Sequence, residues 1–76
     1  MDPEILRQLL DRRPFQPFRM MVTGGIWFEV RHHAMAALLR RTIEFGLPIE
    51  GGQQRFVTVS LIHVICVEVV RPLPNE

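Results

Sequence analysis

The stretch 56–70 reads FVTVSLIHVICVEVV and carries one formal charge, at Glu68. If its second half, 64–70, is extended, successive side chains point to opposite faces of the strand. The two faces then hold Val64, Cys66, Glu68 and Val70 on one side and Ile65, Val67 and Val69 on the other. Both faces are mostly apolar, whereas a half-solvated antiparallel strand alternates apolar with polar residues. The pattern therefore predicts a strand covered on both sides.

The second cover is expected to come from another copy of the chain. The protein has 76 residues, of which 47% are hydrophobic. A chain of this size buries only roughly 60% of its unfolded surface, so its stability margin is thin. Surplus apolar surface on a small domain marks an interface, and association would add the missing stability. We expect one domain, 1–76, that forms a homo-oligomer.

Cysteine usage and charge limit the cellular locations and the partners that the sequence predicts. The one cysteine, Cys66, excludes an intrachain disulfide, and its apolar neighbours predict a small buried hydrophobe. The chain starts with acidic residues rather than with a basic region and an apolar run, and no stretch reaches the ~20 apolar residues of a membrane span. We expect a cytoplasmic protein with no membrane partner. The net charge of +1, with nine unclustered arginines and no lysine, provides little field to steer nucleic acid.

A helix is predicted over about 3–12. Asp2 can cap it, Pro3 suits its first position, and Pro14 ends it. An apolar stripe at helical spacing comprises Ile5, Leu6, Leu9 and Leu10. The segment that follows, Pro14-Phe15-Gln16-Pro17-Phe18, is expected to be an extended connector.

A hairpin is predicted over about 18–31. Alternating hydrophobic residues flank Gly24-Gly25 on both sides. A two-residue loop would pair Thr23 with Ile26, so the alternating hydrophobic residues of the two strands would lie on different faces of the hairpin. A three-residue loop, 23–25, pairs Val22 with Ile26 and brings the alternating hydrophobes to one face. That loop needs a left-handed residue at its end, which Gly25 supplies without steric cost.

The remaining strands are predicted at about 35–39, 42–46, 55–59 and 64–70. Residues 34–41 also have helical spacing and helix-forming alanines, so a helix remains an alternative there. Arg40-Arg41 would form a tight turn. Residues 46–54, with Pro48 and Gly51-Gly52, form the longest expected loop, and 60–63 a tight turn. The tail 72–76 is expected to fray.

This order of elements resembles the five-stranded antiparallel small barrels of the SH3-like and above all the Sm-like type, with an amino-terminal helix. The matching positions are Val22-Thr23-Gly24-Gly25 and Phe28. Gly24 departs from the Asp or Asn of that family, and the Sm-like ligand motif is not recognisable in 59–63. The resemblance implies a mainly β fold, but RNA binding does not follow from it.

A second resemblance is to a family of short uncharacterised bacterial proteins. It is carried by PFQPFR (14–19), FEVRH (28–32), GLP (46–48) and FVTVSLIH (56–63). The family has no assigned activity, so the resemblance supports the fold and implies nothing about function.

No metal, catalytic or cofactor residues are predicted. His32, His33, His63 and Cys66 are the conceivable zinc ligands, but they lack paired spacing, and His63 and Cys66 would face opposite sides of a strand. A thiolate pair of Cys66 with a histidine needs an exposed, electropositive cysteine. No phosphate loop or cofactor fingerprint is present. We therefore expect no enzyme and no cofactor.

The first functional hypothesis is a non-enzymatic interaction or scaffold module that associates with itself. The residues expected to carry this association are Trp27, Ile65, Val67 and Val69. The alternative is an Sm-like nucleic-acid-binding ring, with a cationic cluster at one end of the barrel formed by Arg31, His32, Arg40 and Arg41. The sequence leaves the oligomer number, the ligand, the partner and the pathway open.

Overall fold

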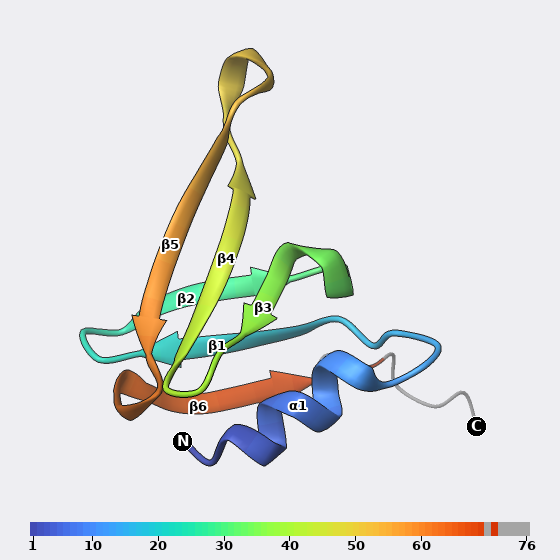
Figure 1. The fold of residues 1–76 in the computed structure, drawn as a ribbon, viewed down its shortest axis with the longest axis vertical. Helices are drawn as coiled ribbons and strands as arrows, with labels where there is room; N and C mark the ends of the chain where they lie inside the picture. The colour runs from blue at the N-terminus through green and yellow to red at the C-terminus, as the bar shows by residue number, and fades with distance from the viewer. Residues whose placement is uncertain (70, 72–76) are drawn as a thin grey trace.

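The computed structural model of the protein describes residues 1–69 and 71. Within this range one α-helix precedes six strands: α1 (Pro3–Asp11), β1 (Phe18–Val22), β2 (Ile26–Val30), β3 (Ala36–Leu38), β4 (Thr42–Pro48), β5 (Gln54–Ser60) and β6 (Val64–Val69). Short 3-10 turns lie at His33–Met35, Glu50–Gly52 and Leu61–His63. Figure 1 shows the ribbon of β4 and β5 rising away from the rest of the molecule.

The described strands form two antiparallel sheets, sheet A with the order β2-β1-β6 and sheet B with the order β3-β4-β5. The predictions of a mainly β protein and of an amino-terminal helix are confirmed. The prediction of a five-stranded barrel needs correction, because residues 1–69 hold six strands and no closed barrel. The six strands correspond to the six segments predicted from the sequence, but the 3-10 turn His33–Met35 separates β2 from β3, and β3 pairs with β4 in the other sheet, so the strands do not close into one barrel.

Helix α1 forms for the local reasons that the sequence predicts. The backbone N–H of Glu4 donates a hydrogen bond of 2.9 Å to the Asp2 carboxylate, which caps the helix. Leu6, Leu9 and Leu10 are buried, but Ile5 remains 48% exposed, so the apolar stripe is narrower than predicted. The helix ends at Asp11, one residue earlier than expected. The guanidinium group of Arg13 then donates to the carbonyl oxygen of Leu10 at 2.9 Å, which satisfies one of the free carbonyls at the helix end.

The first hairpin has the predicted register. Val22 lies opposite Ile26, and the N–H of Gly25 donates to the carbonyl oxygen of Val22 at 3.0 Å. Gly25 has φ 80°, as the three-residue loop requires. Gly24 also has a positive φ, of 96°, so both glycines are needed for their backbone conformation.

Residues 34–41 combine the two alternatives that the sequence left open. A single 3-10 turn, His33–Met35, precedes strand β3, which spans only Ala36–Leu38. The helical spacing therefore yields one turn, and the strand is shorter than the predicted 35–39. Arg40 and Arg41 form the expected tight turn, in which the N–H of Leu39 donates to the carbonyl oxygen of Thr42 at 2.8 Å.

Strands β4 and β5 are longer than predicted. Leu47 and Pro48 were expected in the loop and Gly46 at its boundary with the strand, but all three pair with β5, opposite Arg55, Gln54 and Phe56, respectively. Strand β3 pairs with β4 only as far as Phe45, so the part of the ribbon beyond it has two strands. We name residues 46–56 the arm. The turn at its tip closes through Gly51, with φ 79°, and through the N–H of Ile49, which donates to Gln53 at 3.0 Å.

Strand β6 contains a β-bulge that changes which side chains face the core. Met21 pairs with Cys66 and Val22 with Val64, so Ile65 is the extra residue. The predicted grouping of Ile65, Val67 and Val69 on one outer face is therefore wrong. Val64, at 5% exposure, Val67 and Val69 lie against the core, and Ile65 is 56% exposed. Val70 and the tail 72–76 lie outside the described residues.

The core fills the space between the two sheets and is covered by α1. Its largest fully buried side chains come from all three layers: Leu6, Phe18, Met20, Val30, Ile43 and Phe45. None of the described buried side chains is polar or charged. The radius of gyration is 13.1 Å, larger than the roughly 11 Å expected for a compact chain of this length, because the arm extends the molecule.

Candidate functional site

A groove of about 740 Å³ lies between β2 and the arm. This volume falls within the range of roughly 300–1,000 Å³ that is typical of ligand and docking sites. Its walls are formed mainly by apolar side chains: Ile26, Trp27, Phe28, Met35, Leu47 and Pro48.

The groove exists because the facing strands differ in length. β4 and β5 have seven residues each, whereas β1 and β2 have five. Phe28 of sheet A stacks on Phe45 of sheet B, with ring centroids 4.9 Å apart and planes 5° apart. Leu47 lies two residues beyond Phe45 and therefore points to the same face of the sheet, toward the groove. The groove is thus the open end of the hydrophobic core.

The exposure of Ile26 is a consequence of this open end of the core. It pairs with Val22 and lies on the same face of β2 as Phe28 and the buried Val30, so the alternation directs it toward the core. It is nevertheless 57% exposed, because it lies at the mouth of the groove. An apolar side chain that lies on the core-facing side of its strand but remains exposed indicates a surface that a partner could cover.

Two backbone edges run along the groove. β2 is an outer strand of sheet A, and four consecutive residues, 26–29, line the groove along it. On the opposite wall, residues 46–48 of β4 pair with β5 on one side, and β3 does not reach them on the other. Within the described residues, no strand occupies either edge. The edge of β2 can therefore exchange backbone hydrogen bonds with an added strand, whereas on the β4 edge Pro48 has no N–H to donate.

The charges at the groove are exposed and of both signs. Arg31 donates to Glu29 at 3.2 Å, with both side chains more than half exposed. His32 lies next to Arg31 at the end of β2, and Arg55 lies on the arm opposite Leu47. Neither Arg55 nor the tip residue Glu50 forms an ion pair with another described residue.

The outer face of sheet A is partly covered by its own side chains. The Arg19 guanidinium lies 4.3 Å from the centre of the Trp27 ring and donates to Glu68 at 2.7 Å. Met21 pairs with Trp27 on one side and with Cys66 on the other. The sequence predicts a buried Cys66, but in the structure Cys66 is only half-buried. The outer face of sheet A therefore combines apolar and charged side chains. The Arg19 guanidinium lies over the Trp27 ring and also binds Glu68.

The structure separates the four residues expected to mediate association. Trp27 is 39% exposed and lines the groove, and Ile65 is 56% exposed at the bulge of β6. Val67 and Val69 are half-buried against the core and offer little surface to a partner.

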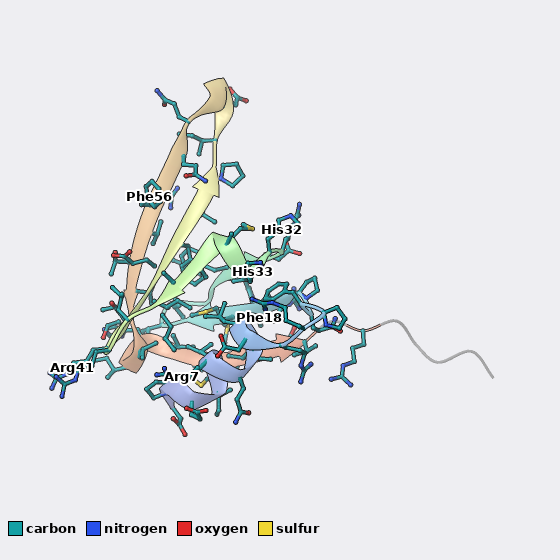
Figure 2. All side chains as sticks on the ribbon, turned by 45° about the vertical axis from the view of Figure 1, so that its right-hand side comes forward. Arg7, Phe18, His32, His33, Arg41 and Phe56 are labelled. Atoms are coloured by element: carbon teal, nitrogen blue, oxygen red, sulfur yellow. The ribbon has the colours of Figure 1, made fainter. Side chains whose placement is uncertain are left out.

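The four residues expected to bind nucleic acid also do not form one cluster. Arg31 and His32 lie at the groove, whereas Arg40 and Arg41 form the turn between β3 and β4. Figure 2 shows His32 and Arg41 on opposite sides of the molecule. Arg40 and Arg41 border a second concavity, of about 460 Å³, together with Ile62, which is 80% exposed.

The histidines lie in three different surroundings. His32 is at the groove, the His33 ring contacts Phe15 with centroids 6.2 Å apart, and the Nδ1 atom of His63 lies 3.2 Å from the Thr23 hydroxyl. Among residues 1–69 and 71, no group of three or more His, Cys, Asp or Glu side chains gathers in a way that could hold a metal ion. None of the described helices is long and apolar enough to cross a bilayer.

Comparisons of the chain with protein-family models, with curated proteins and with solved structures found no match. The resemblances to the Sm-like barrels and to the short bacterial proteins therefore remain predictions. The candidate site stands on its geometry alone.

Sequence reasoning missed the arm and hence the groove. The signal was present, since Ile43, Phe45 and Leu47 continue an alternating pattern past Gly46. Pro48 and the two glycines of the tip led to the assignment of the whole segment as a loop. Proline is tolerated at a strand end or edge because its missing N–H is not needed there, and Pro48 is the last residue of β4.

Proposed function

We propose that the protein is a non-enzymatic interaction module that associates with itself through exposed apolar surface and strand edges. The observation that carries this proposal is the exposure of large hydrophobic side chains in so small a domain. The described residues include eight such side chains with exposed fractions between 39% and 80%: Ile5, Ile26, Trp27, Leu39, Ile49, Phe56, Ile62 and Ile65.

The distribution of these side chains supports association. Ile26 and Trp27 line the groove, and Ile49 and Phe56 lie on the arm. Single exposed hydrophobic residues are normal on a protein surface, but apolar side chains along a concave surface with free strand edges indicate a binding surface. Covering them would also stabilise a domain whose own core is small.

The direct test is the molar mass in solution, measured by multi-angle light scattering over a concentration series. One chain has a mass of 8.9 kDa. We expect a mass that rises with concentration to a defined multiple of this value. A mass of one chain at every concentration would contradict the proposal.

The alternative function is nucleic-acid binding by a ring of subunits. It is supported by Arg40 and Arg41, which border the concavity of about 460 Å³ at the turn between β3 and β4. The test is binding of single-stranded RNA at two salt concentrations. Binding through arginines to phosphates weakens steeply as salt rises, so a lack of binding at low salt, or binding without salt dependence, would contradict it.

A further inference from the structure

We propose that the concavity of about 460 Å³ beside Arg40 and Arg41 binds an alkyl phosphate, meaning a phosphate monoester that carries a short aliphatic chain. The inference goes beyond the proposed self-association and does not depend on it. It concerns the same two arginines as the nucleic-acid alternative, and it assigns them a different ligand.

Two turns that are distant in the sequence form this concavity. One is the turn at Arg40 and Arg41 between β3 and β4, and the other is the 3-10 turn Leu61–His63 between β5 and β6. The N–H of Leu61 donates to the carbonyl oxygen of Arg41 at 2.9 Å, so a backbone hydrogen bond holds the two turns together. The amino group of Met1, which also lines the concavity, donates to the carbonyl oxygen of Leu61 at 3.1 Å. Figure 1 shows both turns close to the amino terminus.

The lining of the concavity is mainly apolar. Leu61 is 5% exposed and belongs to the core, whereas the next residue, Ile62, is 80% exposed, the largest fraction among the described large hydrophobic side chains. Met1 and Pro3 add further apolar surface. Ligand sites typically combine apolar walls with a few polar groups, in a volume of roughly 300–1,000 Å³. An aliphatic chain in the concavity would remove part of the Ile62 side chain from water.

The side chains that carry charge at the concavity are of one sign. Arg40 and Arg41 line it, no acidic side chain does, and neither arginine forms an ion pair with another described residue. Nearby carboxylates have other partners, since Asp2 caps α1 and Glu44 accepts from the Thr58 hydroxyl at 3.5 Å. The electrostatics therefore favour an anion.

Two arginines match a phosphate monoester better than a single carboxylate. Each guanidinium presents a planar fork of N–H donors, which fits the oxygen atoms of a phosphate. A phosphate monoester carries a charge of roughly −1.5 to −2 at pH 7, so it can balance both Arg40 and Arg41, whereas a carboxylate balances only one of them.

The same lining disfavours nucleic acid as the ligand. Single-stranded nucleic acid typically binds with its bases stacked on aromatic rings, along a cationic groove that follows several phosphates. None of the side chains that line the concavity is aromatic, and only two of them are cationic. One phosphate and one aliphatic chain, in contrast, use the arginines and Ile62 together.

The first experiment divides the ligand into its two parts. Hexyl phosphate, inorganic phosphate and 1-hexanol are titrated separately into isotopically labelled protein, and the backbone amide signals are followed by NMR. We expect hexyl phosphate to bind with a dissociation constant in the millimolar range and to shift the amides of 39–42 and 60–63. Each fragment should bind about tenfold more weakly or less, because it uses only part of the site. Equal binding of 1-hexanol, or equal binding of inorganic phosphate, would overturn the proposal.

The second experiment uses substitutions with matched controls. The double variant Arg40→Gln, Arg41→Gln and the single variant Ile62→Ser change exposed side chains, and each is expected to weaken hexyl phosphate binding about fivefold or more. Arg7→Gln on α1 and Ile65→Ser on β6 replace exposed residues of the same types outside the concavity, and we expect no change in binding. Losses of equal size in the site variants and in the controls would overturn the proposal. The amide spectrum of each variant shows whether it is folded.

Two further probes separate related ligands. Single-stranded RNA that shifts the same amides at lower concentration than hexyl phosphate would overturn the proposal in favour of the nucleic-acid alternative. Vesicles of phosphatidylcholine, with or without phosphatidic acid, identify the source of the phosphate monoester. Sedimentation of the protein only with the vesicles that contain phosphatidic acid assigns a lipid headgroup, and sedimentation with neither assigns a soluble molecule. Protein that binds hexyl phosphate but has the mass of one chain at every concentration contradicts self-association and leaves this inference standing.

Discussion

Replacing Val64 by alanine should destabilise the protein much more than replacing its neighbour Ile65. The two residues are adjacent on β6, but the bulge directs them to different sides. Val64 is 5% exposed and pairs with Val22 at the core, whereas Ile65 is 56% exposed. The comparison tests the bulge directly, because the sequence alone groups Ile65 with Val67 and Val69.

The expected magnitudes follow from burial. Val64→Ala removes two buried methyl groups at about 0.8 kcal/mol each, and the cavity left behind raises the total loss in free energy of unfolding to about 2–3 kcal/mol. Ile65→Ala removes three carbon atoms, but more than half of the side chain is already in water, so the loss is about 1 kcal/mol and leaves no cavity. In a domain of this size, each 1 kcal/mol lowers the melting temperature by about 4–8 °C.

The assay is urea unfolding followed by circular dichroism, with the denaturant dependence of the free energy checked for equality between variants. It is run at two protein concentrations, because association stabilises the folded state by mass action. A loss for Ile65→Ala that equals or exceeds the loss for Val64→Ala at both concentrations would refute the bulge. An Ile65 effect that appears only at high concentration would instead place Ile65 in an interface.

Three further changes test local features. Asp2→Ala should lower the free energy of unfolding by about 1 kcal/mol, measured by urea unfolding, because it removes the helix cap that accepts from Glu4. Gly25→Ala should cost about 1–2 kcal/mol, because alanine is strained at a φ of 80° although space is free around it, whereas Gly46→Ala, at a negative φ, should cost clearly less. Arg19→Ala should cost no more than about 1 kcal/mol, because its pair with Glu68 is nearly half exposed, and this loss should shrink in high salt; a large, salt-independent loss would contradict this account.

The features that the sequence predicted correctly depend on local physics. The cap of α1 needs only a carboxylate next to the first free N–H groups. The register of the first hairpin follows from the parity of hydrophobic residues around two adjacent glycines that can adopt positive φ. The turn at Arg40-Arg41 and the turn before β6 likewise follow from short-range constraints. Each of these involves residues only a few positions apart in the chain.

The features that the sequence did not reveal depend on contacts between distant residues. Whether Val67 faces the core or the solvent depends on a one-residue bulge where β6 pairs with β1, about 45 positions earlier in the chain, because one extra residue reverses the parity of everything beyond it. The arm and its groove exist because β4 and β5 are longer than the strands that face them, a mismatch between separate sheets. The sequence by itself determined the helix, the first hairpin and the mainly β class. The tertiary structure alone decided which apolar side chains became core and which remained uncovered, since burial is settled by what packs opposite a residue.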